Sequence, residues 1–145
     1  MLYFIDSNIF LRALHKENKK FFLDCVRLLK NIKENRIKAY TSSIVLAEVV
    51  WTLQSFYGIE KDKIISGLKG ITSLNGLKIT DNYNNVLALD IWQKHSVNFI
   101  DALIASDPAV QDKSASIVSY DRDFDKLKVV RYEPQDIIKN LTLRN

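Results

Sequence analysis

The stretch "SIVSYDRDF", residues 116–124, places a short apolar run directly before two carboxylates, Asp121 and Asp123. A run of this kind, bounded by turn residues, is typical of a buried strand. Aspartate also favours turns, because its side chain accepts a hydrogen bond from the backbone two positions on. The stretch therefore predicts a strand whose end either turns on these acids or presents them to a site.

Short apolar runs alternate with segments of helical period along the rest of the chain. Strands are predicted at 1–5, 37–42, 77–80, 115–120 and 128–133, and helices at 21–32, 43–56, 64–74, 84–94, 99–106 and after Pro134. Strands separated by helices require crossover connections, which favour a mainly parallel sheet covered on both faces. The sequence predicts an α/β fold: a three-layer α/β/α sandwich around a mainly parallel sheet of four to five strands.

The composition predicts one domain. A chain of 145 residues with 47% apolar composition builds one contiguous core, and we expect a domain over 1–140 and a tail at 141–145. The sequence contains neither a signal-peptide pattern nor eighteen consecutive apolar residues, so we expect no contact with a membrane. Cys25 is the only cysteine, which excludes an internal disulfide. These features predict a cytoplasmic protein.

Positive charge is concentrated near the N-terminus. Residues 12–38 contain nine Lys and Arg against three Asp and Glu, while the whole chain has a formal charge of +4. A solvated face of two amphipathic helices explains this pattern, and so does a surface that binds nucleic acid. Tyr3 and Tyr57 are candidates for stacking on bases, whereas we expect Trp51 to pack in the core.

Four acids occupy positions that call for an explanation. Asp6 and Asp121 each follow a predicted strand, so parallel strands would bring both to the carboxyl edge of the sheet, where open α/β sheets bind ligands. Glu48 and Asp101 lie within apolar helical segments, and a buried carboxylate costs several kcal/mol unless it is compensated.

Each acid also has a local explanation. Asp6 can cap a helix, Asp121 can form a turn, Asp101 can complete a capping box with Asn98, and Glu48 can pair with a buried arginine. One shared explanation replaces all four. Four carboxylates that converge on one pocket require cations between them. Oxygen ligands favour a hard divalent ion such as Mg²⁺ or Mn²⁺.

Four stretches resemble the acidic motifs of the PIN-domain family: "FIDSNIFL" (4–11), "SSIVLAEVVWTL" (42–53), "FIDALIAS" (99–106) and "IVSYDRDFDKL" (117–127). They stand in the family's order and at its typical spacing across nearly the whole chain. The compact length is similar to that of the VapC-type toxins of bacterial and archaeal toxin–antitoxin pairs. The resemblance implies a single PIN-like domain.

The resemblance also implies which residues do the chemistry. The implied catalytic and metal-binding acids are Asp6, Glu48, Asp101 and Asp121. The implied supporting residues are Asn8, Ser119 and Asp123. One stretch, "ASDPAVQDK" (105–113), departs from the family's pattern, because it breaks the third helix at Pro108. Asp107 lies about 240° further round a helix than Asp101, at 100° per residue, so we expect it outside the site.

The implied activity is hydrolysis of RNA phosphodiester bonds with one or two Mg²⁺ or Mn²⁺ ions, leaving a 5′-phosphate and a 3′-hydroxyl. The implied partners are the RNA substrate, a cognate antitoxin protein and a second copy in a homodimer, with residues 21–32 and 43–57 as candidate surfaces. Candidate RNA-binding residues are Arg12, Lys16, Lys19 and Lys20. We expect His15 and His95 at the surface or at helix ends.

Two other functions remain open at this point. A catalytically silent PIN-fold module would bind RNA or act as a scaffold. A phosphoryl-transfer or response-regulator domain would also carry acids at strand ends, but it needs a second acid beside Asp6 or a lysine at the last strand.

Overall fold

Five parallel strands form the centre of the computed structural model, which describes residues 1–144. The strands are β1 (Leu2–Ile5), β2 (Lys38–Thr41), β3 (Leu77–Ile79), β4 (Ala115–Val118) and β5 (Arg131–Tyr132). Their order in the sheet is β3-β2-β1-β4-β5, and each neighbouring pair is parallel. The predicted α/β fold is confirmed, with β5 shorter than the range 128–133 suggested.

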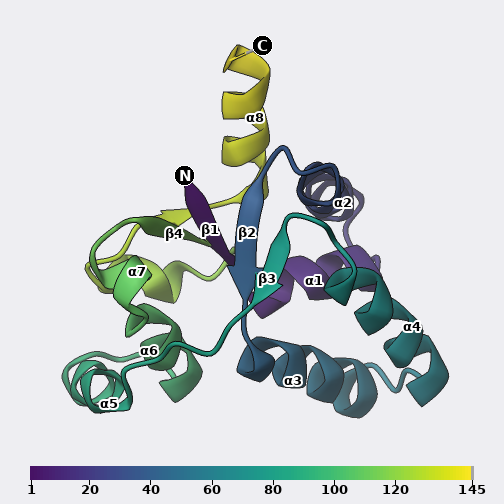
Figure 1. Ribbon diagram of the computed structural model, residues 1–145. Coiled ribbons are helices and arrows are strands. Elements are labelled where there is room, and N and C mark those ends of the chain that lie inside the picture. The colour runs from purple at the N-terminus through teal and green to yellow at the C-terminus, as the bar shows by residue number, and fades with distance from the viewer. Residues whose placement is uncertain (145) are drawn as a thin grey trace.

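Helices cover both faces of this sheet. Figure 1 shows α1, α2 and α4 on one side and α5, α6 and α7 on the other, with α3 below the carboxyl ends of the strands. Their bounds are α1 Ser7–Leu14, α2 Lys19–Lys33, α3 Ser43–Trp51, α4 Lys61–Thr72, α5 Asn85–Lys94, α6 Phe99–Ala105, α7 Pro108–Gln111 and α8 Pro134–Arg144. A π-helical segment, η1 (Thr52–Phe56), continues α3, and a 3₁₀ segment, η2 (Arg122–Lys126), follows β4.

The core lies along the two central strands. Phe4 and Ile5 of β1 and Ile117 and Val118 of β4 have no exposed surface. Strands buried on both faces carry continuous apolar runs, which is why "MLYFI" and "SIV" lack the alternation of a half-exposed strand. The core therefore fixes the positions of the residues that directly follow β1 and β4.

The break predicted at Pro108 is present. Helix α6 ends at Ala105, and Pro108 is the first residue of α7. The side chain of Asp107 caps α7 by accepting a hydrogen bond of 2.8 Å from the Ala109 backbone N–H. Proline suits the first helical position because its missing N–H would have no partner there.

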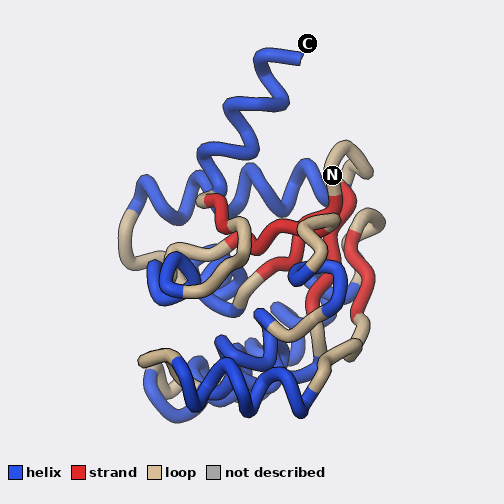
Figure 2. Tube along the Cα trace, turned by 90° about the vertical axis from the view of Figure 1, so that its left-hand side faces the viewer, coloured by secondary structure: helices blue, strands red, loops and turns tan. Residues whose placement is uncertain are grey.

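Helix α8 lies apart from the carboxyl edge of the sheet. It projects from the opposite end of the molecule in both views (Figures 1 and 2) and contacts α2. It continues across residue 140 to Arg144, while Asn145 lies outside the described residues, so the division into a domain and a tail stays a prediction. Within residues 1–144, no helix has the length and apolar character needed to cross a bilayer.

The chain reverses its direction of winding between β1 and β4. From β1 it moves to β2 and β3 on one side, and then returns to β4 and β5 on the other. In open parallel sheets a crevice forms outside the carboxyl ends of the strands at such a point. The residues that follow β1 and β4 lie there.

Candidate functional site

Asp6 and Ser119 face each other across this switch point. Ile5 pairs with Val118 in the sheet register, so the next residue of each strand is brought alongside the other. The Ser119 hydroxyl donates to Asp6 Oδ2 at 2.6 Å and accepts from the Asp121 backbone N–H at 3.0 Å. One buried hydroxyl thereby couples the acid of the first strand to the acid of the fourth.

Asn8 supports the same arrangement from the first turn of α1. Its amide nitrogen donates to Ser119 Oγ at 2.9 Å and to Asp6 Oδ2 at 3.3 Å. Its amide oxygen accepts from the Tyr120 backbone N–H at 3.2 Å. Asn8 therefore locks the β4–η2 turn to the start of α1.

Asp101, Asp121 and Asp123 form the tightest group of acids. One oxygen of each lies within 4.8 Å of the others, and Asp101 is buried while the other two are half-buried. Asp121 Oδ1 also caps η2, accepting from the Asp123 backbone N–H at 2.9 Å. Asp123 pairs with Lys126 at 2.9 Å. Asp123 thus both shapes the turn and stands beside Asp121.

Asp101 lacks the partners that its burial demands. It is 4% exposed, and Asn98 caps α6 by accepting its backbone N–H at 2.9 Å. Its side-chain atom Oδ2, however, receives no hydrogen bond from any described residue. A buried acceptor without a partner costs about 1–3 kcal/mol. The capping box explains the backbone of Asp101 but not its carboxylate.

Glu48 approaches from α3. The Ser7 hydroxyl donates to Glu48 Oε1, and Glu48 is half-buried. The expected alternative, a buried arginine partner, is not found among residues 1–144. Since Ser7 directly follows Asp6, this contact brings the acid of α3 toward the acid of the first strand.

Electrostatics couple all four acids. Burial, together with the negative charges of Asp121, Asp6 and Glu48, raises the pKa of Asp101 to about 8. Burial is also the main reason that the pKa of Asp6 is raised; the charges of Glu48 and Asp121 add to the increase, hydrogen bonds from Ser119 and Ser7 oppose it, and the resulting pKa is about 6. Like charges held together in this way are the condition that a cation relieves.

The residues present fit a divalent cation. The donors are oxygens of carboxylates, the type that Mg²⁺ and Mn²⁺ prefer. Asp101, a member of the acidic group, has a buried Oδ2 without a hydrogen-bond partner among residues 1–144, which leaves this atom free to act as a ligand. Asp101, Asp121 and Asp123 could each offer one oxygen to an ion, and Asp6 and Glu48 are neighbouring carboxylates that could complete the site.

Asp107 does not belong to the group. It is 3% exposed, caps α7 and lines a different cavity, together with Tyr40 and Lys78. Sequence reasoning missed Arg131, whose Nη1 donates to the backbone carbonyl of Ser119 at 2.8 Å and whose Nε pairs with Asp125 at 2.9 Å. No local pattern marks this contact, because it joins two strands through a side chain.

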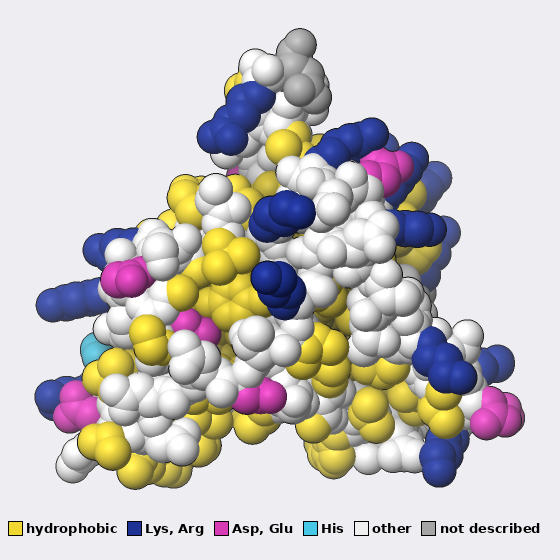
Figure 3. Space-filling view, in the orientation of Figure 1, with side chains coloured by type: hydrophobic (Ala, Val, Ile, Leu, Met, Phe, Trp, Pro, Cys, Tyr) yellow, Lys and Arg dark blue, Asp and Glu magenta, His cyan; other side chains and the backbone are white. Residues whose placement is uncertain are grey.

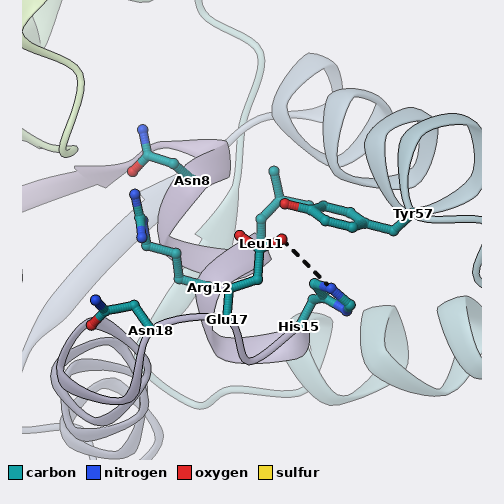
Figure 4. A pocket seen from close by; sticks show the side chains of 7 residues that line it. All are labelled: Asn8, Leu11, Arg12, His15, Glu17, Asn18 and Tyr57. Carbon is teal, nitrogen blue, oxygen red and sulfur yellow. Dashed lines mark ion pairs between the residues drawn. The ribbon is translucent and has the colours of Figure 1, made fainter.

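The basic residues proposed for RNA binding lie on α1, α2 and the segment between them. Lys16, Lys19 and Lys20 are exposed, and Lys20 pairs weakly with Asp24 at 3.8 Å. Arg12 is half-buried and lines a pocket that also contains Asn8 (Figure 4). Of the four candidates, Arg12 is thus linked to the acids through a shared neighbour.

The surface also carries exposed apolar side chains. Trp51, expected in the core, is 65% exposed, so that prediction was wrong; Phe56 of η1 is 75% exposed. Val86, Leu89 and Trp92 of α5 are exposed as well. Figure 3 shows apolar side chains along the lower edge of one face, over α3, α5 and α6.

The comparisons with known proteins agree with this geometry. The model of the PIN domain family matches residues 3–130, which include all four acids. A search of curated protein sequences gives no significant match. The family assignment therefore rests on the match to the family model over residues 3–130.

Three solved structures share the fold. The crystal structure of VapBC2 from Rickettsia felis, bound to a promoter DNA fragment, has 26% identity and a TM-score of 0.60, covering 92% of this chain and 98% of that one. PAE2754 from Pyrobaculum aerophilum has 13% identity and a TM-score of 0.69, with 99% and 96% covered. VapC20 from Mycobacterium tuberculosis, described as a sarcin–ricin loop cleaving toxin, has 16% identity and a TM-score of 0.66, with 92% and 100% covered.

Proposed function

The chain belongs to the PIN domain family, and from this premise we propose that it is a metal-dependent endoribonuclease and the toxin of a type II toxin–antitoxin pair. The observation that supports the proposal is the acidic group of Asp101, Asp121 and Asp123, in which Asp101 has an unpartnered buried oxygen. Asp6 and Glu48 lie near enough for their charges to raise the pKa of Asp101. The similarity to VapBC2 and VapC20 over more than nine-tenths of the chain supports it.

The proposed catalytic and metal-binding residues are Asp6, Glu48, Asp101 and Asp121. One or two Mg²⁺ or Mn²⁺ ions bound there would supply Lewis-acid catalysis of phosphodiester hydrolysis. The protein's own contribution is positioning. Ser119 and Asn8 fix the carboxylate of Asp6, and Ser7 fixes that of Glu48. Preorganised groups of this kind spare the reaction the cost of ordering them.

A catalytically silent module is a poorer explanation of the same residues. A protein that only binds RNA gains nothing from a buried carboxylate held next to three others, because the arrangement is destabilising without a cation. Replacing Asp101 by an apolar residue would remove that cost.

We also propose a cognate antitoxin and a homodimer. The antitoxin is inferred from VapBC2, whose crystal structure contains both proteins of the pair with DNA. Of the two surfaces suggested by the sequence, α3 with η1 has large exposed apolar side chains, while the exposed apolar residues of α2, Leu23 and Val26, are 37% and 39% exposed.

The deciding experiment is cleavage of an end-labelled RNA pool by purified, antitoxin-free protein with Mn²⁺ or Mg²⁺. We expect cutting that EDTA abolishes and that Asp101→Asn reduces by at least a hundredfold, because a carboxylate ligand is lost. The matched control is Asp90→Asn, which changes an exposed aspartate of α5 and should cut like the wild type. Metal-independent cutting, or full activity of Asp101→Asn, would contradict the proposal.

A further inference from the structure

Asn8, which donates a hydrogen bond to Asp6, also lines a pocket on α1. The pocket is lined by Asn8, Leu11, Arg12, His15, Glu17, Asn18 and Tyr57 (Figure 4). Its volume is about 140 Å³, which is small compared with the roughly 300 Å³ or more of sites for drug-sized ligands. The pocket is therefore too small to enclose a whole small-molecule ligand, and it suits parts of an extended ligand that continues outside it. Asn8 also donates hydrogen bonds to Asp6 and Ser119, so this side chain separates the pocket from the acid of the first strand.

Arg12 forms one end of this pocket. Its guanidinium carbon lies 4.4 Å from the ring centroid of Phe21 and 4.8 Å from that of Tyr120. These rings hold the guanidinium by cation–π contacts without neutralising its charge. Within residues 1–144 it makes no ion pair, so its forked N–H donors remain available. A planar, fixed guanidinium suits bidentate binding of a phosphate.

The other end of the pocket is aromatic and acidic. The ring centroids of His15 and Tyr57 are 4.1 Å apart, and Glu17 Oε1 lies 3.8 Å from His15 Nε2. A hydrogen bond to Glu17 raises the pKa of the Tyr57 hydroxyl. The negative charge of Glu17 disfavours a phosphate here, while the ring faces can stack on a base. In Figure 4, Arg12 points toward Asn8, away from this end.

We infer that the residues of this pocket contact one nucleotide of the RNA beside the cleaved bond, with a phosphate on Arg12 and the base against His15 and Tyr57. The inference rests on the proposed ribonuclease function and deepens it, because it names the residues that place the strand. Arg12 is a positioning residue: it holds a flanking phosphate and leaves the chemistry to the acids. Phe21 and Tyr120 serve to hold Arg12 in place.

The test compares steady-state cleavage and its salt dependence in Arg12→Gln, Arg12→Lys and Tyr57→Leu. Arg12→Gln should raise KM about tenfold or more with little change in kcat, because a charge-assisted contact made in the bound state is lost. The slope of log(kcat/KM) against log[salt] should fall by about 0.7, the value for one phosphate contact on a single strand. Tyr57→Leu should raise KM about tenfold without changing that slope.

A control variant, Arg36→Gln, and the conservative variant Arg12→Lys make the result decisive. Arg36→Gln removes an exposed charge just before β2, at the opposite edge of the sheet, and should leave KM unchanged. Arg12→Lys keeps the charge and should restore the salt slope while KM stays raised, since lysine lacks the fork. Thermal unfolding of each variant confirms that it is folded.

The outcomes separate this inference from the function on which it rests. No metal-dependent cutting by the wild type would overturn the ribonuclease itself. Cutting by the wild type with unchanged KM and salt slope in folded Arg12→Gln would overturn the pocket and leave the ribonuclease standing. A changed KM in Arg12→Gln but not in Tyr57→Leu would overturn the base contact.

Discussion

At the scale of single residues, the acids make local contacts and still leave oxygen atoms for a site. Asp6 Oδ1 accepts from the Ser7 backbone N–H at 2.8 Å, and Asp121 Oδ1 caps η2, as the turn explanation requires. Asp101 Oδ2 is left without a partner. The local roles of these acids in caps and turns are therefore compatible with a shared cation site, because a carboxylate has two oxygens and one can serve each role.

The raised pKa values give the metal-free protein a defined pH dependence. Asp101, with a pKa near 8, and Asp6, with a pKa near 6, bind protons more tightly when folded than at the usual value near 4. The native state then binds more protons than the unfolded state, so stability falls as pH rises between about pH 4 and pH 8. In EDTA the melting temperature should be lower at pH 8 than at pH 5.

The variant Asp101→Asn isolates the larger of these effects. An amide does not ionise, so the stability of the variant should fall much less as pH rises from about 4 to 8. At pH 8 in EDTA the variant should therefore melt at a higher temperature than the wild type. Asp90→Asn changes an exposed residue and should keep the wild-type pH dependence, with a free energy of unfolding within about 0.5 kcal/mol of the wild type. A wild-type melting temperature that rises from pH 5 to pH 8 in EDTA would contradict the assignment of these acids.

At the scale of elements, periodicity predicted most of the architecture. The apolar runs located the central strands because β1 and β4 are buried on both faces. The break at Pro108 followed from the stereochemistry of proline. Sequence patterns did not predict the exposure of Trp51 or the Arg131 contact with Ser119, because both depend on how distant elements pack.

The surface of α3 and η1 leads to a prediction about association. Light scattering should give twice the chain mass of 16.7 kDa for the wild type. The double variant Trp51→Ser, Phe56→Ser removes the two largest exposed apolar groups of this surface and should shift the mass toward one chain. Leu143→Ser, which changes an exposed leucine of α8, is the control. A wild-type monomer at high concentration would contradict the homodimer.

At the scale of the whole molecule, the fold decides where the chemistry is placed. Strand direction alone predicted that Asp6 and Asp121 share the carboxyl edge, and the order of the strands makes them neighbours across the switch point. The apolar helical segments around Glu48 and Asp101 added these two acids, and the resemblance assigned all four as metal ligands. The pocket between Arg12 and Tyr57 could not be predicted, because it requires α1 and η1 to be placed side by side in three dimensions.

The central claim is that the acids hold a divalent cation, and calorimetric titration with Mn²⁺ at pH 7 tests it most directly. We predict saturable binding to the wild type with release of protons, because Asp101 must deprotonate to act as a ligand. Asp90→Asn should bind Mn²⁺ as the wild type does, and Asp101→Asn should bind it much more weakly. Equal binding by the wild type and Asp101→Asn, or no binding by folded wild-type protein, would contradict the account.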